Sequence, residues 1–180
     1  MSDATSRETY APPRNRALER SDLTFVHGLF NDPDVMRYWF EPAHATITDL
    51  EADFDRQRGR DEQRRFIVEA SGRRVGIVEL MYIDHVHRNC EFQIIISPTE
   101  QGRGYAGAAT REILDFAFRA LNLHKVWLLV DTENAAAIHV YEKVGFAVEG
   151  VLRQEFFADG AYRDATRMAI FQRDYLAAAR

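Results

Sequence analysis

The sequence predicts a mixed α/β domain in which helices flank a twisted, mostly antiparallel sheet. Apolar runs typical of strands alternate with helical patterns along the 180 residues. Turn residues join two pairs of these runs, which predicts hairpins. A further run leads through a glycine-rich loop into a long helix. Since no Pro/Gly/Ser-rich linker divides the chain, we expect one domain over residues 17–180, preceded by a flexible segment over residues 1–16.

Helical patterns come first along the chain. Ser21 is the expected N-cap of a helix that should stop near residues 31–33, where Asn-Asp-Pro follows the apolar pattern. A short, aromatic-rich element is expected over residues 35–40. Thr48 should then start a third helix.

Strands follow. Residues 66–70 and 75–82 are compact β-type runs, and the Ser71-Gly72 turn between them predicts a hairpin. A third strand is expected over residues 89–97. It ends in three consecutive isoleucines at 94–96, and such an uninterrupted apolar run is typical of a strand covered on both faces.

The second half repeats this alternation. We expect a helix over residues 105–121, a buried strand over 125–131, a helix over 134–144 that stops at Gly145, and a closing hairpin of 149–157 and 163–171 around Asp159-Gly160.

Composition and charge limit the kind of partner. A formal charge of −5 argues against nucleic acid, which attracts clustered positive charge. No apolar run approaches the ~20 residues that span a bilayer, and the N-terminus lacks the pattern of a signal peptide. We therefore expect a cytoplasmic protein that binds no membrane. The single cysteine, Cys90, is expected to be a packed structural residue.

The glycine-rich loop predicts a site for a phosphate-bearing ligand. Backbone N–H groups at the start of a helix favour an anion, and glycine lets a ligand approach closely. Gly102, Gly104 and Gly107 satisfy the G-x-G-x-x-G pattern of dinucleotide sites, but the mostly hairpin-forming sheet does not suit a doubly wound fold. A P-loop is excluded because no Gly-Lys-Ser/Thr follows. The remaining interpretations are a purely structural turn and the pattern Gln-x-x-Gly-x-Ala, at Gln101, Gly104 and Ala106.

This last pattern resembles the pyrophosphate-binding motif of the GCN5-related N-acetyltransferases (GNAT). The stretch from Asn134 to Phe146 is similar to the asparagine-to-Y-x-x-x-G-F segment of the same superfamily. Other stretches resemble the bacterial spermidine/spermine N-acetyltransferases within it. They are Leu18-Glu-Arg, Met36-Arg-Tyr-Trp-Phe-Glu41, Glu91-Phe-Gln-Ile-Ile-Ile-Ser-Pro98, Leu121-Asn-Leu-His-Lys125 and Glu155-Phe-Phe-x-Asp-Gly-x-Tyr-Arg163.

The resemblance implies a GNAT fold whose sheet is split by a V-shaped cleft for acetyl-CoA. It makes Tyr141 the general acid that protonates the departing thiolate, and it implies no metal. Glu91 is the candidate that binds the amine and relays its proton through water. The resemblance implies that acetyl-CoA contacts Ile94, Ile95, Ile96, Gln101, Gly102, Arg103, Gly104, Tyr105, Ala106, Gly107, Asn134, Ala136, Ala137, Tyr141 and Lys143.

The substrate implied by the resemblance is a polyamine, spermidine or spermine. The residues expected to bind it are Met36, Trp39, Glu41, Asp49, Glu91, Phe92 and Gln93. Two alternatives remain open: acetylation of another amine, such as a protein N-terminus or an aminoglycoside, and a noncatalytic regulator that binds CoA or polyamine. A dinucleotide oxidoreductase ranks last.

The resemblance also implies a homo-oligomer, since the family forms dodecamers, and a regulatory polyamine site between subunits. Met36, Glu41 and Asp49 match positions of that site. This chain departs from the family at four positions where acidic residues are common, which are occupied here by Pro42, Ala45, Gln63 and Tyr82. Because these departures remove carboxylates, we expect weak or absent activation by polyamine.

Overall fold

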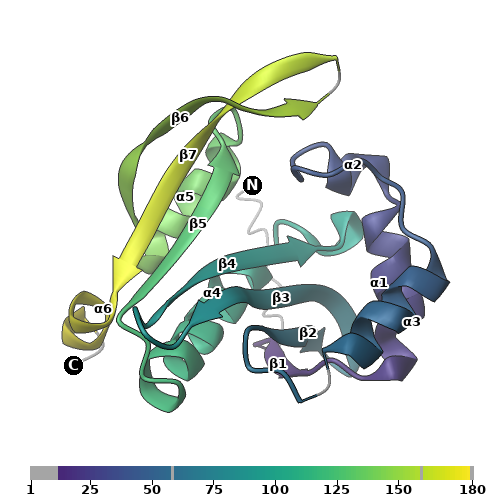
Figure 1. The fold of residues 1–180 in the computed structure, drawn as a ribbon, viewed down its shortest axis with the longest axis horizontal. Helices are drawn as coiled ribbons and strands as arrows, with labels where there is room; N and C mark the ends of the chain where they lie inside the picture. Colours follow the sequence, from purple (N-terminus) through teal and green to yellow (C-terminus); the bar gives the residue numbers. More distant parts are fainter. Residues whose placement is uncertain (1–11, 58, 159, 179–180) are drawn as a thin grey trace, which may run out of the picture.

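One seven-stranded sheet organises the chain, of which the computed structural model describes residues 12–57, 59–158 and 160–178 (Figure 1). The strand order is β1-β2-β3-β4-β5-β7-β6. Neighbouring strands are antiparallel except β4 and β5, which are parallel. The mixed, mostly antiparallel sheet is therefore confirmed. The strands are β1 (Arg14–Ala17), β2 (Arg64–Ala70), β3 (Arg73–Asp84), β4 (Asn89–Ile96), β5 (Lys125–Asp131), β6 (Ala147–Ala158) and β7 (Ala161–Phe171).

Helices cover both faces of this sheet (Figure 1). α4 and α5 pack on one face, and α1 and α3 pack on the other. Within the described ranges no helix is long and apolar enough to cross a membrane. The helices are α1 (Leu23–Phe30), α2 (Pro33–Met36), α3 (Ile47–Arg56), α4 (Tyr105–Asp115, continued by a π-helical turn over Phe116–Ala120), α5 (Ala135–Val144) and α6 (Gln172–Ala178).

β4 contributes to the apolar core on both of its faces. Phe92 and Ile96 belong to the larger cluster, which includes residues of α4. Ile95 belongs to a second cluster with Val26 of α1 and Leu50 of α3. The alternation of side chains along a strand explains the division, and the prediction of a strand covered on both faces is confirmed.

β4 and β5 separate after a short parallel ladder. Their register runs from Asn89↔Lys125 to Glu91↔Trp127. Beyond that point β4 continues beside β3 as far as Ile96, and β5 continues beside β7 as far as Asp131. The two strands diverge from a common end in Figure 1. This splay agrees with the V-shaped split that the resemblance implied.

Two helix starts differ from the sequence prediction. Ser21 does not cap α1 but lies within a 3₁₀ turn over Arg20–Asp22, and α1 begins at Leu23. Thr46 rather than Thr48 caps α3, because its hydroxyl accepts a hydrogen bond from the backbone N–H of Asp49 at 3.1 Å. Ser, Thr and Asp can all act as N-caps, and several of them lie near each of these two helix starts. The sequence pattern alone therefore does not determine which residue caps the helix.

The ends of the domain also differ from expectation. Arg14–Arg16 were assigned to a flexible segment, yet they form β1 with Ala17 and pair with β2. This edge strand is polar, and so it lacks the apolar signal from which strands are recognised. The short helix α6 was not predicted at all. The rest of the expected flexible segment, residues 1–11, and Asp159 of the expected turn lie outside the described residues.

Candidate active site

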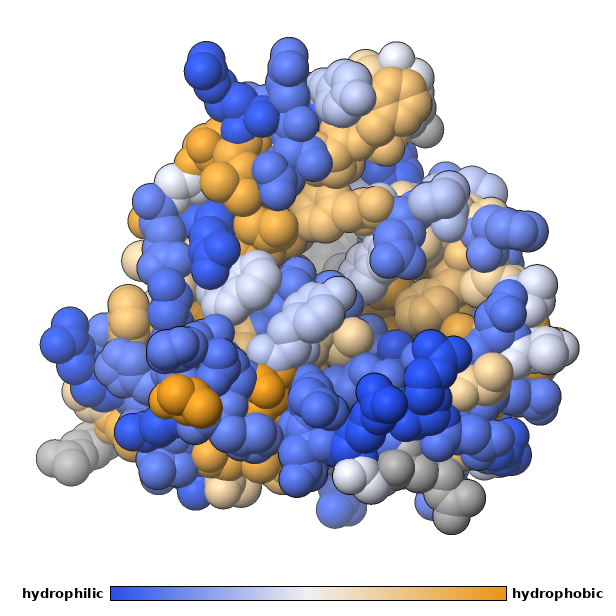
Figure 2. Space-filling view, viewed as in Figure 1, coloured by the Kyte–Doolittle hydropathy of each residue, from blue (hydrophilic) through white to orange (hydrophobic). Residues whose placement is uncertain are grey.

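A cavity of about 640 Å³ opens where β4 and β5 separate. The space-filling view shows the surface hollowed between the β6–β7 ribbon and the region of α2 (Figure 2). Its walls come from β4, the glycine loop, the first turn of α4, β5, α5 and the segment around α2. Most of the residues expected at the site line it: Trp39, Glu41, Glu91, Phe92, Gln93, Ile94, Ile95, Ile96, Gln101, Gly102, Gly104, Tyr105, Ala106, Gly107, Asn134, Ala136, Ala137 and Tyr141.

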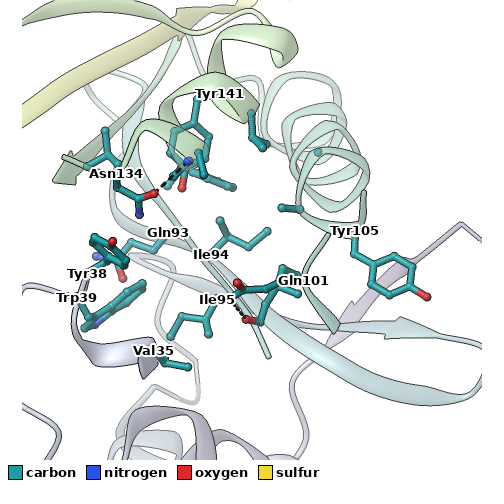
Figure 3. A pocket seen from close by; sticks show the side chains of 18 of the residues that line it. Val35, Tyr38, Trp39, Gln93, Ile94, Ile95, Gln101, Tyr105, Asn134 and Tyr141 are labelled. Atoms are coloured by element: carbon teal, nitrogen blue, oxygen red, sulfur yellow. Dashed lines mark hydrogen bonds between the residues drawn. The ribbon is translucent and has the colours of Figure 1, made fainter. Parts of the chain in front are cut away.

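The glycine loop has a backbone that side chains would strain. Gly102 has φ = 76° and Gly104 has φ = 79°, both in the left-handed region. Gly104 is the N-cap of α4, so the N–H groups at the start of this helix lie at the cavity wall. The Gln101 side chain donates a hydrogen bond from Nε2 to the carbonyl oxygen of Ile96 at 3.1 Å, which ties the loop to the end of β4 (Figure 3). The result is a preformed cradle suited to an anion.

Arg103 of the loop is engaged by a buried carboxylate. Its Nη1 lies 2.8 Å from Oε2 of Glu100, whose Oε1 lies 3.0 Å from Nη1 of Arg73. Glu100 lines the cavity, whereas Arg103 and Arg73 are not among the lining residues.

Tyr141 reaches the cavity from α5. Asn134 starts this helix by accepting a hydrogen bond from the N–H of Ala137 at 3.1 Å, and Gly145 ends it with φ = 113°. The Tyr141 ring packs edge-to-face on Phe92, with ring centroids 6.0 Å apart. Burial raises the pKa of Tyr141 to about 12, so its hydroxyl is protonated and able to donate at neutral pH.

Glu91 reaches the cavity from the opposite face of the sheet. It shares a face of β4 with Gln93, whereas Phe92, which contacts Tyr141, points to the other face. The carboxylate is buried, with 8% of the residue exposed, and Oε1 accepts a hydrogen bond from Gln93 Nε2 at 3.2 Å. Burial raises the pKa of Glu91, while the Gln93 hydrogen bond and the charge of Arg167 oppose that rise. The acid and carboxylate candidates thus line one cavity from opposite faces of the sheet, where the strands part.

The segment around α2 forms a wall of the cavity that the sequence predicted only in part, through Trp39 and Glu41. Tyr38 and Trp39 lie side by side next to Gln93 (Figure 3). Carboxylates accompany these aromatic rings, from Asp34 and Glu41. The aromatic run at 38–40 beside Glu41 was a signal for such a wall, but its place opposite β4 depends on tertiary packing. The lining residues that sequence reasoning missed are Asp34, Val35, Tyr38, Phe40, Glu100, Leu129, Val130 and Val140.

Four expected site residues do not line the cavity. Met36 is the buried last residue of α2, and Asp49 lies in the first turn of α3, where it accepts a hydrogen bond from the Thr46 hydroxyl. Lys143 is exposed on α5, and Arg103 pairs with Glu100. Tyr105 lines the cavity, but its side chain belongs to the core and points away from the other labelled residues (Figure 3).

Residues 15–147 match the model of the Acetyltransferase (GNAT) domain family. Spermidine N(1)-acetyltransferase of Escherichia coli K12 is 52% identical over 162 residues, covering 90% of this chain and 87% of the relative. The Vibrio cholerae serotype O1 protein of that name is 46% identical, covering 89% and 94%. The structure of spermidine N-acetyltransferase from Vibrio cholerae, solved in complex with CoA and spermine, has a TM-score of 0.89 at 45% identity and covers 91% and 98%.

Proposed function

The chain belongs to the GNAT acetyltransferase family, and on that premise we propose that it transfers the acetyl group of acetyl-CoA to a primary amine of a polyamine. Acetyl-CoA is the cosubstrate of this family. The observation that carries the proposal is one cavity with different ends: an N–H-lined glycine loop at one end, and carboxylates with aromatic rings at the other. The first end suits a pyrophosphate and the second suits a cationic amine.

The chain's own residues fit acetyl-CoA. A Cβ added at Gly102 or at Gly104 would meet no protein atom within 4 Å, so a ligand can approach the loop backbone there. The pairing of β4 with β5 ends at Glu91. Past this residue, an extended chain that carries amide groups can pair with the edge of β4 that faces β5, as an added strand would. Ile94, Ile95 and Ile96 provide that edge, at the base of the cavity.

Glu91 is the residue that we assign to the amine. A primary ammonium has a pKa of about 10, so a proton must leave before its nitrogen can attack a carbonyl carbon. In this mechanism the Glu91 carboxylate orients the ammonium and accepts its proton through one water. Gln93 fixes the carboxylate by its hydrogen bond.

Tyr141 is the residue that we assign to the leaving group. The amine nitrogen bonds directly to the acetyl carbon, the carbon–sulfur bond breaks, and the sulfur takes a proton from the Tyr141 hydroxyl. The nitrogen loses its second proton as the amide forms, and solvent returns a proton to the Tyr141 oxygen. The burial that raises its pKa also keeps the hydroxyl from losing this proton to solvent. No covalent bond to the enzyme is required in this scheme.

The remaining amino groups of a polyamine are also cationic. Asp34 and Glu41 offer negative charge, and Tyr38 and Trp39 offer ring faces that attract cations. We assign this wall to the part of the polyamine that does not react.

Thiol release from acetyl-CoA tests the proposal. We expect release with spermidine and with spermine, and little with an aminoglycoside or a peptide N-terminus. Release with those acceptors only would assign another amine to the site, and no release with any amine would indicate a noncatalytic regulator. The cytoplasmic location and the homo-oligomer expected from the resemblance remain predictions.

A further inference from the structure

A fixed cation stands next to the Glu91–Trp127 pair. Glu91 and Trp127 are register partners on parallel neighbours, so their side chains share one face of the sheet. Arg167 of β7 places its guanidinium carbon 4.2 Å from the centroid of the Trp127 ring. Its Nε lies 3.2 Å from Oε2 of Glu149 on β6. Two independent contacts therefore hold this guanidinium on the face that carries Glu91.

We propose that Arg167 is a positioning residue of the active site, whose fixed charge keeps Glu91 in the carboxylate form that binds and deprotonates the amine. The inference rests on the proposed function, since it assigns Arg167 a part in the work of Glu91. Arg167 touches Trp127 and Glu149, and it acts on Glu91 through the field of its charge.

The charge of Arg167 is not cancelled by Glu149. The same carboxylate is 2.5 Å from Nζ of Lys125, so two cations share one anion. The group of Lys125, Glu149 and Arg167 carries one net positive charge, and removing Arg167 would leave a neutral pair. Stacking on Trp127 also limits the positions open to the guanidinium.

The other groups around Glu91 also influence whether its side chain is a neutral acid or a carboxylate. Burial favours the neutral acid, and the Gln93 amide favours the carboxylate. On β3, Met81 is the register partner of Glu91, and Glu79 on the same face is paired with Arg65. Asp34 and Glu41 line the same cavity from the α2 side, and Cys90 points to the opposite face. Arg167 therefore adds a positive charge to an environment of Glu91 that is otherwise largely apolar and acidic.

The test compares Arg167→Met and Arg167→Gln, which remove the charge, with Arg167→Lys, which keeps it. The kcat/KM for spermidine is measured from pH 6 to pH 9 with each. We expect the neutral variants to lose about three- to tenfold more kcat/KM at pH 6 than at pH 9 relative to the native enzyme, because a protonated Glu91 cannot act as the base. Arg167→Lys should retain most of the native profile. The free amine titrates identically in all assays, so a displaced acid limb belongs to the enzyme.

Arg119→Met is the matched control. Arg119 pairs with Asp115 on the segment that covers the opposite face of the sheet, and its loss removes the same charge. It should leave the profile unchanged. A loss in the Arg167 variants that is uniform across pH, or an equal displacement in Arg119→Met, would overturn the inference.

A ¹³C NMR titration of the Glu91 carboxyl, assigned with Glu91→Gln, gives a second readout that needs no turnover. Its midpoint should move to higher pH in Arg167→Met, and an unmoved midpoint would overturn the inference. Absence of polyamine acetylation by the native protein would instead overturn the proposed function, while the titration would still decide the effect of Arg167 on Glu91.

Discussion

Glu91 and Trp127 form the last register pair between β4 and β5 before the two strands part. A buried carboxylate therefore stands at the apex of the cleft. The parallel ladder ends there, while β4 continues beside β3 and β5 continues beside β7. The interruption that opens the cavity also places Glu91 at its base, on the face opposite to Phe92 and Tyr141.

Glu91→Gln should separate activity from stability. Loss of the carboxylate should lower kcat/KM about 10²-fold near neutral pH. The difference in kcat/KM from the native enzyme should shrink toward about pH 9.5, where more of the amine is already neutral. Because burial raises the pKa of Glu91 in the folded state, ionisation of this group opposes folding as the pH rises. Glutamine removes that penalty, so denaturant unfolding at pH 8 should show a stability equal to or above the native value. A strongly destabilised variant would contradict the burial argument.

Tyr141→Phe should reduce turnover strongly, by about 10²-fold or more, while the affinity for acetyl-CoA stays nearly constant. Phenylalanine keeps the ring contacts with Phe92 and Phe146, so only the hydroxyl is lost. Calorimetric titration of acetyl-CoA and steady-state kinetics check the two halves separately. Unchanged turnover would remove the assigned role.

Local patterns predicted much of this arrangement. The three isoleucines at 94–96 and the glycine loop carry strong local signals, and both lie as expected. Asn134 and Gly145 likewise mark the ends of α5 as their residue types suggest.

What the sequence did not show depends on long-range contacts. Tyr38 and Asp34 face the cavity because α1 and α3 pack on the sheet and hold the α2 segment opposite β4. Arg103 belongs to the expected motif, yet the buried Glu100 binds it. Arg167 comes near Glu91 through the strand order β4-β5-β7, which no local pattern encodes.

Gly104→Ala should weaken acetyl-CoA binding about tenfold, because alanine disfavours the φ of 79° that presents the loop N–H groups. The KM for polyamine should change little. Gly59→Ala is the matched control: Gly59 has φ = 78° and similar open space, but it lies in the loop after α3. Both should lose about 1 kcal/mol of stability. Equal loss of acetyl-CoA affinity in both variants would contradict a specific role for Gly104.

Polyamine should activate the enzyme weakly or not at all. Of the residues matched to the family's regulatory site, Glu41 lines the cavity, while Met36 is buried and Asp49 is bonded to Thr46. Initial rates against spermine concentration should therefore be hyperbolic. Sigmoidal kinetics that become hyperbolic after preloading with polyamine would show that a regulatory site persists.

Arg65 should stabilise the fold through Glu79, which is almost fully buried on β3. Arg65 Nε lies 2.7 Å from Glu79 Oε1, and its Nη1 lies 2.6 Å from Asp53 Oδ2 on α3. Arg65→Met leaves the Glu79 carboxylate buried without its counter-ion, which should cost about 2–4 kcal/mol at pH 7. Denaturant unfolding measures this loss.

The stability lost in Arg65→Met should be smaller at pH 5 than at pH 7. Burial raises the pKa of Glu79 above that of the unfolded chain, so the folded state takes up this proton more readily, and lower pH favours folding of the variant. Arg65→Met combined with Glu79→Gln should recover most of the stability at pH 7, because no buried charge remains. Arg119→Met, which breaks an exposed pair, should cost no more than about 0.5 kcal/mol. A loss in Arg65→Met that is independent of pH and not recovered by Glu79→Gln would show that Arg65 acts through packing rather than through the charge of Glu79.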